Sequence, residues 1–283
     1  MEKQLPISVW PEWKIIEKIG EGSFGKVYKA QRIVQGKTFY SAIKVITIPS
    51  SQGELSSVRS ENPDEQSVKE YFHSLVEDCI QEVSDLPISV DSPSAEVLAQ
   101  VFPYCKRPGL INSVSGEGNK MDVLFPLIAD TKWEVICLLS DDTGIPKCAA
   151  DRLRVFDNIM AKAKEYGISP DRMHIDPLVE MLCTSEDGIA MNVEVISTIR
   201  EKYPDIHITA AVSNISFNLP VRKMVNLGFT VLAMNAGLDS AILDPTNRDM
   251  MGVIYATEAL LGRDDYCMEY ISAYREGIFG PKK

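Results

Sequence analysis

Short apolar runs and helical stretches alternate from Leu86 to the C-terminus, and this alternation limits the possible folds more than any other feature. Strands that alternate with helices predict βαβ units and a parallel sheet, so we expect an α/β fold. The helical stretches are clearest at 149–167 and 192–203. The runs that we interpret as buried strands are 87–91 (PISVD), 109–115 (GLINSVS), 133–140 (WEVICLLS), 173–178 (MHIDPL), 207–213 (HITAAVS) and 240–245 (SAILDP).

Polar residues stand at or just past the predicted carboxyl ends of many of these strands. They are Asp91, Asn112, Asp141, Asp176 and Asn214. In an α/β barrel the carboxyl ends of the strands carry the active site, so these side chains are candidates for one shared site. The alternative for each single position is the N-cap of the following helix, a place where Asp and Asn are common.

The first part of the chain follows a different pattern. Between Trp13 and Ile46, short strand-like runs are separated by glycine-rich or polar turns, which predicts an antiparallel meander. A polar loop follows, and apolar residues at helical spacing then predict an amphipathic helix from about Asp64 to Val83. We therefore divide the chain into segments 1–83 and 84–283.

A glycine motif, GEGSFGKV, lies within the predicted meander. Glycines allow backbone N–H groups to approach a triphosphate, and a nearby lysine can neutralise its charge. Alone the pattern is weak, because dinucleotide folds use similar glycines, but here another strand-like run follows in place of a helix. The candidate nucleotide-binding residues are Gly20, Gly22, Gly25, Val27 and Lys44.

This motif and the lysine that follows it resemble the N-terminal lobe of eukaryotic-type Ser/Thr protein kinases. The resemblance implies that Lys44 pairs with Glu82 of the predicted helix, with Glu77 as the alternative. It ends near Val83, and no HRD, DFG or APE segment follows. These segments supply the catalytic base and magnesium ligands, so we predict no protein kinase activity and at most weak binding of ATP.

The composition excludes several classes of protein. The 29 Lys and Arg residues are outnumbered by 40 Asp and Glu, which argues against non-specific binding to nucleic acid or anionic membranes. Six cysteines without CxxC spacing and only three histidines predict neither a disulfide framework nor a bound metal. No signal-like segment and no run near the ~20 apolar residues of a membrane span is found, so we expect a cytoplasmic protein.

Several segments of the second part occur in the order and spacing of a known family. They are DLPISVDSPS, LINSVSGE, DDTGIP, MHIDPL, VSNISFNLPVRK, GLDSAILDP and LLGRDDYCMEYI. From about Glu77 onward, the chain thus resembles the pterin-binding methyltransferases that carry a methyl group from methyltetrahydrofolate to a corrinoid protein. The resemblance implies the TIM barrel of dihydropteroate synthase. With the kinase-like segment in front, the chain as a whole is chimera-like.

The same resemblance implies roles for particular side chains. A pterin ring presents an edge of N–H donors, which carboxylate and amide oxygens accept. Asp91, Asn112 and Asp176 would hold this edge, and Asn214, with an ordered water, would assist catalysis at N5, the atom that bears the methyl group. Arg222 would contact the folate or orient its loop. The corrinoid would be carried by a partner protein, so no cobalt ligand is expected in this chain.

The chain also departs from the family pattern. Ser94 replaces the asparagine usual after DSP, and Asn218 replaces a glycine. The kinase-like segment stands where the family has its first two βα units, so we expect an incomplete barrel whose edge strands are 87–91 and 240–245, each apolar on both faces. Uncovered edges invite pairing, which predicts a homo-oligomer or a marginally stable monomer.

Two alternative functions stay open. The first is a non-catalytic chimera that binds ATP or folate without turnover. The second is a condensing enzyme of the dihydropteroate synthase type, which we disfavour because its typical loop lysine and Ser-Arg segments have no obvious match.

Overall fold

The computed structural model describes residues 14–22, 25–34, 37–45, 81 and 86–281. The chain divides into two compact units, 1–79 and 80–283, and each is described by itself. The helix predicted from about Asp64 to Val83 lies, apart from Gln81, outside the described residues, as do Glu77 and Glu82.

The first unit contains an antiparallel sheet with the strand order β1-β2-β3, which confirms the predicted meander. Across the β1–β2 hairpin Gly22 pairs with Gly25, and Val27 of β2 pairs with Lys44 of β3. The glycine motif therefore spans one hairpin, next to the strand that carries the lysine. The strands are β1 (Lys14–Gly22), β2 (Gly25–Val34) and β3 (Lys37–Val45).

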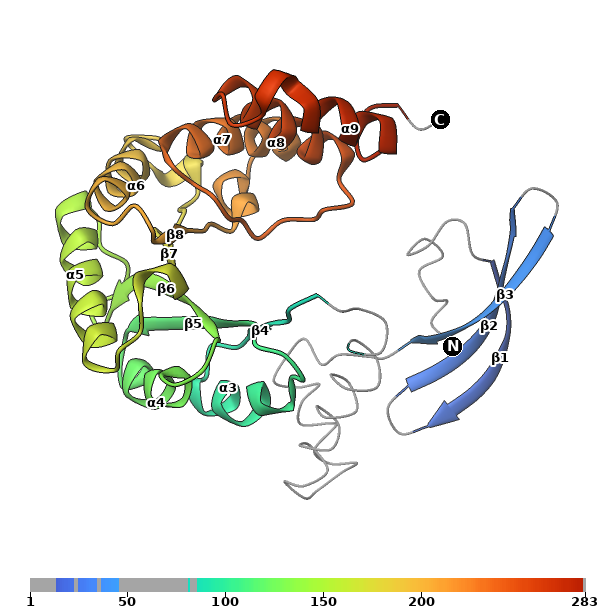
Figure 1. Ribbon diagram of the computed structural model, residues 1–283, viewed down its shortest axis with the longest axis horizontal. Helices are drawn as coiled ribbons and strands as arrows, with labels where there is room; N and C mark the ends of the chain where they lie inside the picture. The colour runs from blue at the N-terminus through green and yellow to red at the C-terminus, as the bar shows by residue number, and fades with distance from the viewer. Residues whose placement is uncertain (1–13, 23–24, 35–36, 46–80, 82–85, 282–283) are drawn as a thin grey trace. The chain divides into compact units, whose positions relative to one another are not determined.

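The second unit is built on a parallel sheet with the order β4-β5-β6-β7-β8, so the predicted α/β fold is confirmed. Figure 1 shows these strands on the inner side of an arc of helices. The strands are β4 (Ser89–Asp91), β5 (Leu110–Gly116), β6 (Glu134–Asp141), β7 (Met173–Asp176) and β8 (His207–Ile208).

The predicted strand at 240–245 is wrong. The structure has only an isolated bridge there, between Ala211 and Ile242, and the amide of Ile242 donates to the carbonyl of Ala210 at 2.9 Å. The neighbouring strand β8 spans only His207–Ile208, so it is too short to form a continuous ladder with a sixth strand.

The prediction that both edge strands are apolar on both faces is also wrong. The described sheet has β4, which lies within the predicted run 87–91, at one edge, but its other edge is β8 and not 240–245. In β4, Ser89 and Asp91 are exposed and only Val90 is half-buried. Polar residues at this edge reduce the apolar surface that another chain could cover.

Helices cover the outer face of the sheet and enclose the core. Fully or almost fully buried residues of the strands include Ile111, Val135, Cys137, Met173 and Ile175. The helices are α3 (Ala95–Val101), α4 (Lys120–Ile128), α5 (Ala149–Glu165), α6 (Ala190–Lys202), α7 (Arg222–Ala236), α8 (Arg248–Leu260) and α9 (Met268–Glu276). Short 3-10 turns are η2 (Phe102–Tyr104), η3 (Pro170–Arg172), η4 (Leu182–Thr184), η5 (Val212–Ser216) and η6 (Asp265–Cys267).

Two of these helices confirm the stretches predicted at 149–167 and 192–203, namely α5 and α6. Ser94, one of the departures from the family pattern, is the N-cap of α3, and its hydroxyl accepts the backbone N–H of Val97 at 3.3 Å. In the part of the chain that the structure describes, no helix has the length and apolar character needed to cross a membrane.

The segment after α9 folds back against α8. The Phe279 ring is buried, with its centroid 5.9, 4.8 and 6.0 Å from those of Tyr255, Tyr270 and Tyr274. Arg248, the first residue of α8, donates hydrogen bonds to the backbone carbonyls of Gly277, Phe279, Gly280 and Pro281.

Candidate functional site

The sheet brings three predicted ligands of the pterin onto one face. Asp91 at the end of β4 pairs with Asn112 of β5, which pairs with Ile136 of β6. Asp176 at the end of β7 pairs with Leu138, two residues further along β6. Paired residues of a parallel sheet point to the same side, as do residues two apart on a strand. Asp91, Asn112 and Asp176 therefore share the face opposite the core residues that pack under the helices.

Asp176 is the most enclosed of these side chains, with 6% of its surface exposed. One carboxylate oxygen accepts the backbone N–H of Leu178 at 2.8 Å. Burial raises the pKa of Asp176 to about 6, although the Leu178 N–H and the Arg152 guanidinium act in the opposite direction. At neutral pH the group is thus mainly an ionised, buried carboxylate, which favours binding of a ligand that donates N–H groups.

The other two side chains are more open. Asp91 is exposed and Asn112 is half-buried. In residues 86–281, neither side chain forms a hydrogen bond with another residue of the chain. A carboxylate, an amide and the buried Asp176 carboxylate therefore offer acceptors on the same face of the sheet.

Asn214 and Arg222 lie beyond β8 rather than at a strand end. Asn214 is half-buried within η5. Arg222 donates from Nε to Ser216 Oγ at 2.9 Å and from Nη2 to the Ser213 carbonyl at 2.8 Å. Its guanidinium also lies 4.6 Å from the centroid of the Phe217 ring. These contacts join Arg222 to the segment around Asn214 and favour the loop-orienting alternative for this arginine.

Asp141 has a local structural role. Its Oδ1 accepts the Thr143 N–H at 3.0 Å and the Thr143 hydroxyl at 2.5 Å, and its Oδ2 pairs with Arg154 at 3.1 Å. The Thr143 hydrogen bonds, followed by Arg154, lower the pKa of Asp141. Because both oxygens are engaged, Asp141 is a turn residue and a poor candidate for ligand binding.

Sequence reasoning missed Arg152 of α5, a completely buried cation close to Asp176. The signal was in the helical pattern. Arg152 lies three residues after Ala149, four before Phe156 and seven before Ile159, all of which are buried. A charged residue within the apolar stripe of a helix indicates a specific buried partner.

Glu117, just past β5, was missed as well. It accepts the Ser140 hydroxyl at 2.9 Å and pairs with Lys120 at 2.8 Å, and the bond to Lys120 is the main cause that lowers the pKa of Glu117. The residue thereby ties the end of β5 to β6. The sequence signal was its place in LINSVSGE, directly after a predicted strand.

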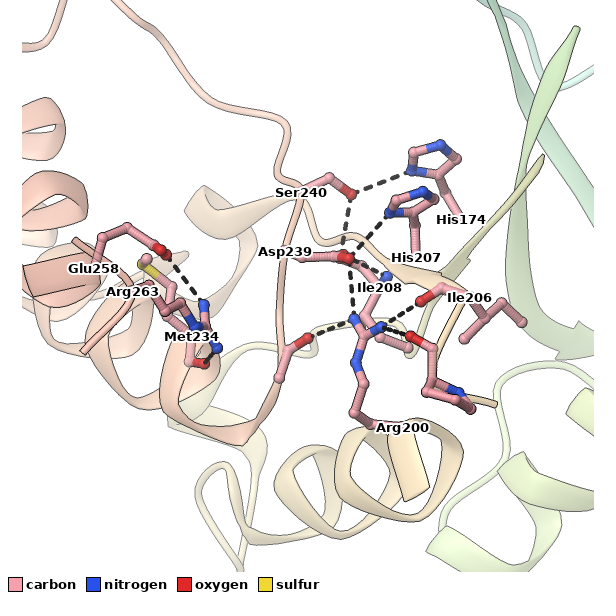
Figure 2. Close-up of polar contacts among 12 residues, drawn as sticks. His174, Arg200, Ile206, His207, Ile208, Met234, Asp239, Ser240, Glu258 and Arg263 are labelled. Carbon is pink, nitrogen blue, oxygen red and sulfur yellow. Dashed lines mark hydrogen bonds and ion pairs between the residues drawn. The ribbon is translucent and has the colours of Figure 1, made fainter. Parts of the chain in front are cut away.

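A second polar cluster lies at the opposite, amino-terminal ends of the strands (Figure 2). The rings of His174 and His207 stack with centroids 4.7 Å apart. His174 pairs with Glu134 at 2.7 Å, and Asp239 bridges His207 and Arg200 at 3.0 and 3.1 Å. That end of a barrel serves stability rather than chemistry, so we interpret this cluster as structural. Among the described residues, no three His, Cys, Asp or Glu side chains are grouped to hold a metal ion.

Comparison with known proteins identifies the family. Residues 54–244 match the model of a family described as pterin binding enzyme. The chain belongs to the pterin-binding enzymes. Because the match begins at residue 54, strands β1–β3 lie outside it, and the resemblance of that region to a kinase lobe remains a prediction.

One relative of this pterin-binding enzyme is named as a methyltransferase, and another is named as a methionine synthase. The methylcorrinoid:tetrahydrofolate methyltransferase of Eubacterium limosum is 50% identical over 206 residues, which cover 72% of this chain and 76% of the relative. The methionine synthase of Mycobacterium tuberculosis (strain ATCC 25618 / H37Rv) is 29% identical over 173 residues, 56% of this chain but only 14% of that protein.

Solved structures of dihydropteroate synthase share the fold of this pterin-binding enzyme. The Xanthomonas albilineans enzyme in complex with 7,8-dihydropteroate superposes with a TM-score of 0.52 at 17% identity, over 69% of this chain and 73% of that structure. A dihydropteroate synthetase with its product gives 0.51 at 18% identity, over 78% of each chain. At these identities the likeness concerns the fold alone.

Proposed function

We propose that the chain is a methyltransferase that moves a methyl group from methyltetrahydrofolate to a corrinoid protein. The observation that carries this proposal is the buried carboxylate of Asp176, which shares one sheet face with Asp91 and Asn112. The 50% identity to a methylcorrinoid:tetrahydrofolate methyltransferase supports the same reaction class. The family match alone would also allow other enzymes that bind pterins.

The acceptors on this face match the donors of a pterin. Asp176, Asn112 and Asp91 accept the N–H groups along the pterin edge, and the enclosed Asp176 provides the strongest of these bonds because it is ionised and shielded from water. The chemistry of the donor set therefore fits the ligand. Arg222 holds the segment that contains Asn214 in place.

Asn214 acts at the atom that carries the methyl group. A tertiary amine leaves more easily when its nitrogen receives a hydrogen bond that strengthens in the transition state. We assign this bond to the Asn214 side chain together with an ordered water. A corrinoid bound to a partner protein supplies the cobalt that exchanges the methyl group.

The direction of transfer is a separate question. The Eubacterium limosum relative is named for transfer from methylcorrinoid to tetrahydrofolate, the reverse of the direction that the sequence resemblance implies. Forward and reverse transfer share one transition state, so the same side chains serve both.

The test is methyl transfer by the full chain between methyltetrahydrofolate and reduced free cobalamin, and the reverse between methylcobalamin and tetrahydrofolate, followed by the visible spectrum of the cobalamin. Asn214→Ala should slow transfer roughly a hundredfold while folate affinity changes little. The exposed Asn235 of α7 provides a matched control, and Asn235→Ala should behave like the parent. Folate binding without transfer in either direction would favour the non-catalytic alternative.

A second candidate activity, nucleotide binding by the first unit, rests on the pairing of Val27 with Lys44 beside the Gly22–Gly25 hairpin. We infer weak ATP binding there without phosphoryl transfer to protein, because the catalytic segments of kinases are absent from the sequence. Fluorescent ATP analogues should bind the parent and not Lys44→Met. Transfer of labelled phosphate to any protein substrate, abolished by Lys44→Met, would contradict this inference.

A further inference from the structure

Arg152 of α5 is a completely buried guanidinium, and it is surrounded by acceptors. Burying a cation is unfavourable unless its donors are satisfied and its charge is balanced. Nε donates to the Pro146 carbonyl at 3.2 Å, and Nη2 pairs with Glu180 at 2.7 Å. Nη1 donates to the carbonyls of Pro177 and Leu178 and to Asn192 Oδ1. The residue thus joins the loop after β6, the loop after β7 and helix α6.

Two of these acceptors belong to the turn that begins at Asp176. Leu178 has a φ of 62°, a left-handed conformation that is costly for a leucine and persists only when its surroundings enforce it. Its carbonyl accepts Arg152 Nη1 at 2.8 Å, while its N–H donates to Asp176 Oδ1 at 2.8 Å. Arg152 is therefore linked to the Asp176 carboxylate through the backbone of one residue, Leu178.

We propose that Arg152 is a positioning residue for the pterin site: by holding the turn 176–178 it fixes one oxygen of Asp176 and leaves the other directed to the ligand. This inference rests on the proposed function, since it assumes that Asp176 binds the pterin. Arg152 itself does not contact the ligand.

The charge of Arg152 adds a second effect. Burial raises the pKa of Asp176, and attraction by the guanidinium opposes that rise. Glu180 pairs with Arg152 Nη2 at 2.7 Å and balances its charge. Loss of the cation should therefore raise the pKa of Asp176 further, so that the carboxylate is protonated, and folate binding is lost, at a higher pH than in the parent.

Two variants separate position from charge. Arg152→Lys keeps the charge but loses the several N–H donors of the planar guanidinium. We therefore expect methyltetrahydrofolate to bind roughly tenfold more weakly or worse, while the pH at which affinity is lost on the acidic side (the acidic limb of the pH profile) stays unchanged. Arg152→Gln loses the charge, so its acidic limb should also shift to higher pH. In a chain that already carries Asp176→Asn, neither change at position 152 should cause much further loss of affinity.

Arg172 provides a matched control. Its guanidinium also donates hydrogen bonds to backbone carbonyls, those of Ile128, Ala129 and Trp133, but it lies at the amino-terminal ends of the strands. Arg172→Lys should lower thermal stability without moving the affinity or the pH profile. All measurements use calorimetric titration of the full chain with methyltetrahydrofolate between about pH 5 and 8, a range that spans the acidic limb.

The outcomes distinguish this inference from the proposed function. A parent chain that does not bind methyltetrahydrofolate would overturn both. If the parent binds, either of two results would overturn only the positioning role. The first is that the changes at position 152 cause equal losses of affinity that add to the loss caused by Asp176→Asn. The second is that Arg172→Lys causes the same loss of affinity. If one variant at 152 fails to fold, the other still carries the comparison, and unfolding of both while Arg172→Lys folds would assign Arg152 to the fold alone.

Discussion

At the scale of single residues, the buried carboxylate of Asp176 is costly to the folded state. Its pKa in the folded chain is raised to about 6, well above its value in an unfolded chain. The folded state therefore binds the proton more tightly, and stability from this group rises as pH falls through 6. Above pH 6 the ionised group is destabilising, a condition expected where function requires a buried charge.

Asp176→Asn should consequently weaken binding and stabilise the fold. An amide still accepts the Leu178 N–H but carries no charge, so we expect folate affinity to fall by about 1–3 kcal/mol. The free energy of unfolding at pH 7.5 should rise, by at most about 3 kcal/mol for a pKa difference near two units. Calorimetric titration and urea unfolding measure the two quantities.

The pH dependence provides the internal control for this substitution. At about pH 4 the parent is largely protonated at Asp176, so the difference in unfolding free energy between parent and variant should shrink. Equal folate affinity in both proteins would show that Asp176 does not contact the pterin.

The sequence was informative about Asp176 because an acidic residue ends a buried strand. For Arg152 the position within the apolar stripe of α5 was a signal that this arginine points inward, in contrast to the exposed Arg154. The stripe does not name the partners, and only the contacts of the folded chain show that Arg152 reaches the turn after Asp176. The enclosure of Asp176 relative to the exposed Asp91 likewise depends on residues distant in the sequence.

At the scale of elements, the pairing of β4 with β5 depends on the absence of a side chain at Gly109. A Cβ built at this position would lie 2.1 Å from the Ile88 carbonyl oxygen, a backbone atom that also accepts the Leu110 N–H at 3.0 Å. Gly109→Ala should therefore push the strands apart and destabilise the second unit by about 1–3 kcal/mol.

Gly228 in α7 is the matched control for that substitution. No atom lies within 4 Å of a Cβ built there, and the residue sits inside a helix, where alanine is preferred over glycine. Gly228→Ala should therefore stabilise the chain by about 0.5–1 kcal/mol. Thermal unfolding that shows the same sign for both variants would contradict this account of the β4–β5 contact.

Element types were predictable, whereas the extent of pairing was not. Continuous apolar runs were sufficient to predict β5, β6 and β7, and helical periodicity predicted α5 and α6. The run 240–245 has the same apolar character, but a strand also needs a neighbour. Since β8 spans only His207–Ile208, the length of this ladder is decided by tertiary structure rather than by the run itself.

At the scale of the whole molecule, association remains a prediction. The described parallel sheet ends at β4 and β8, and apolar side chains such as Leu232 of α7 and Leu260 of α8 are exposed, at 53% and 81%. We expect a homo-oligomer, or failing that a marginally stable monomer, because sheet edges and apolar surface favour association. Light scattering with thermal unfolding measures both properties. A compact, highly stable monomer of 31.5 kDa with one sharp transition would contradict the expectation.

The way Arg248 holds the last described residues has a practical consequence. This guanidinium contacts the main-chain carbonyls of Gly277, Phe279, Gly280 and Pro281, and a carbonyl group is the same whatever side chain its residue carries. These contacts do not depend on side-chain identity, but Phe279 is buried and Gly277 and Gly280 have φ of 78° and 83°, so the segment is sensitive to substitution at these positions as well as to shortening. In a fusion protein, the junction should therefore lie after Pro281. A chain cut at the end of α9 would lack the Phe279 ring that packs against the three tyrosines, and the N–H donors of Arg248 would lose these acceptors.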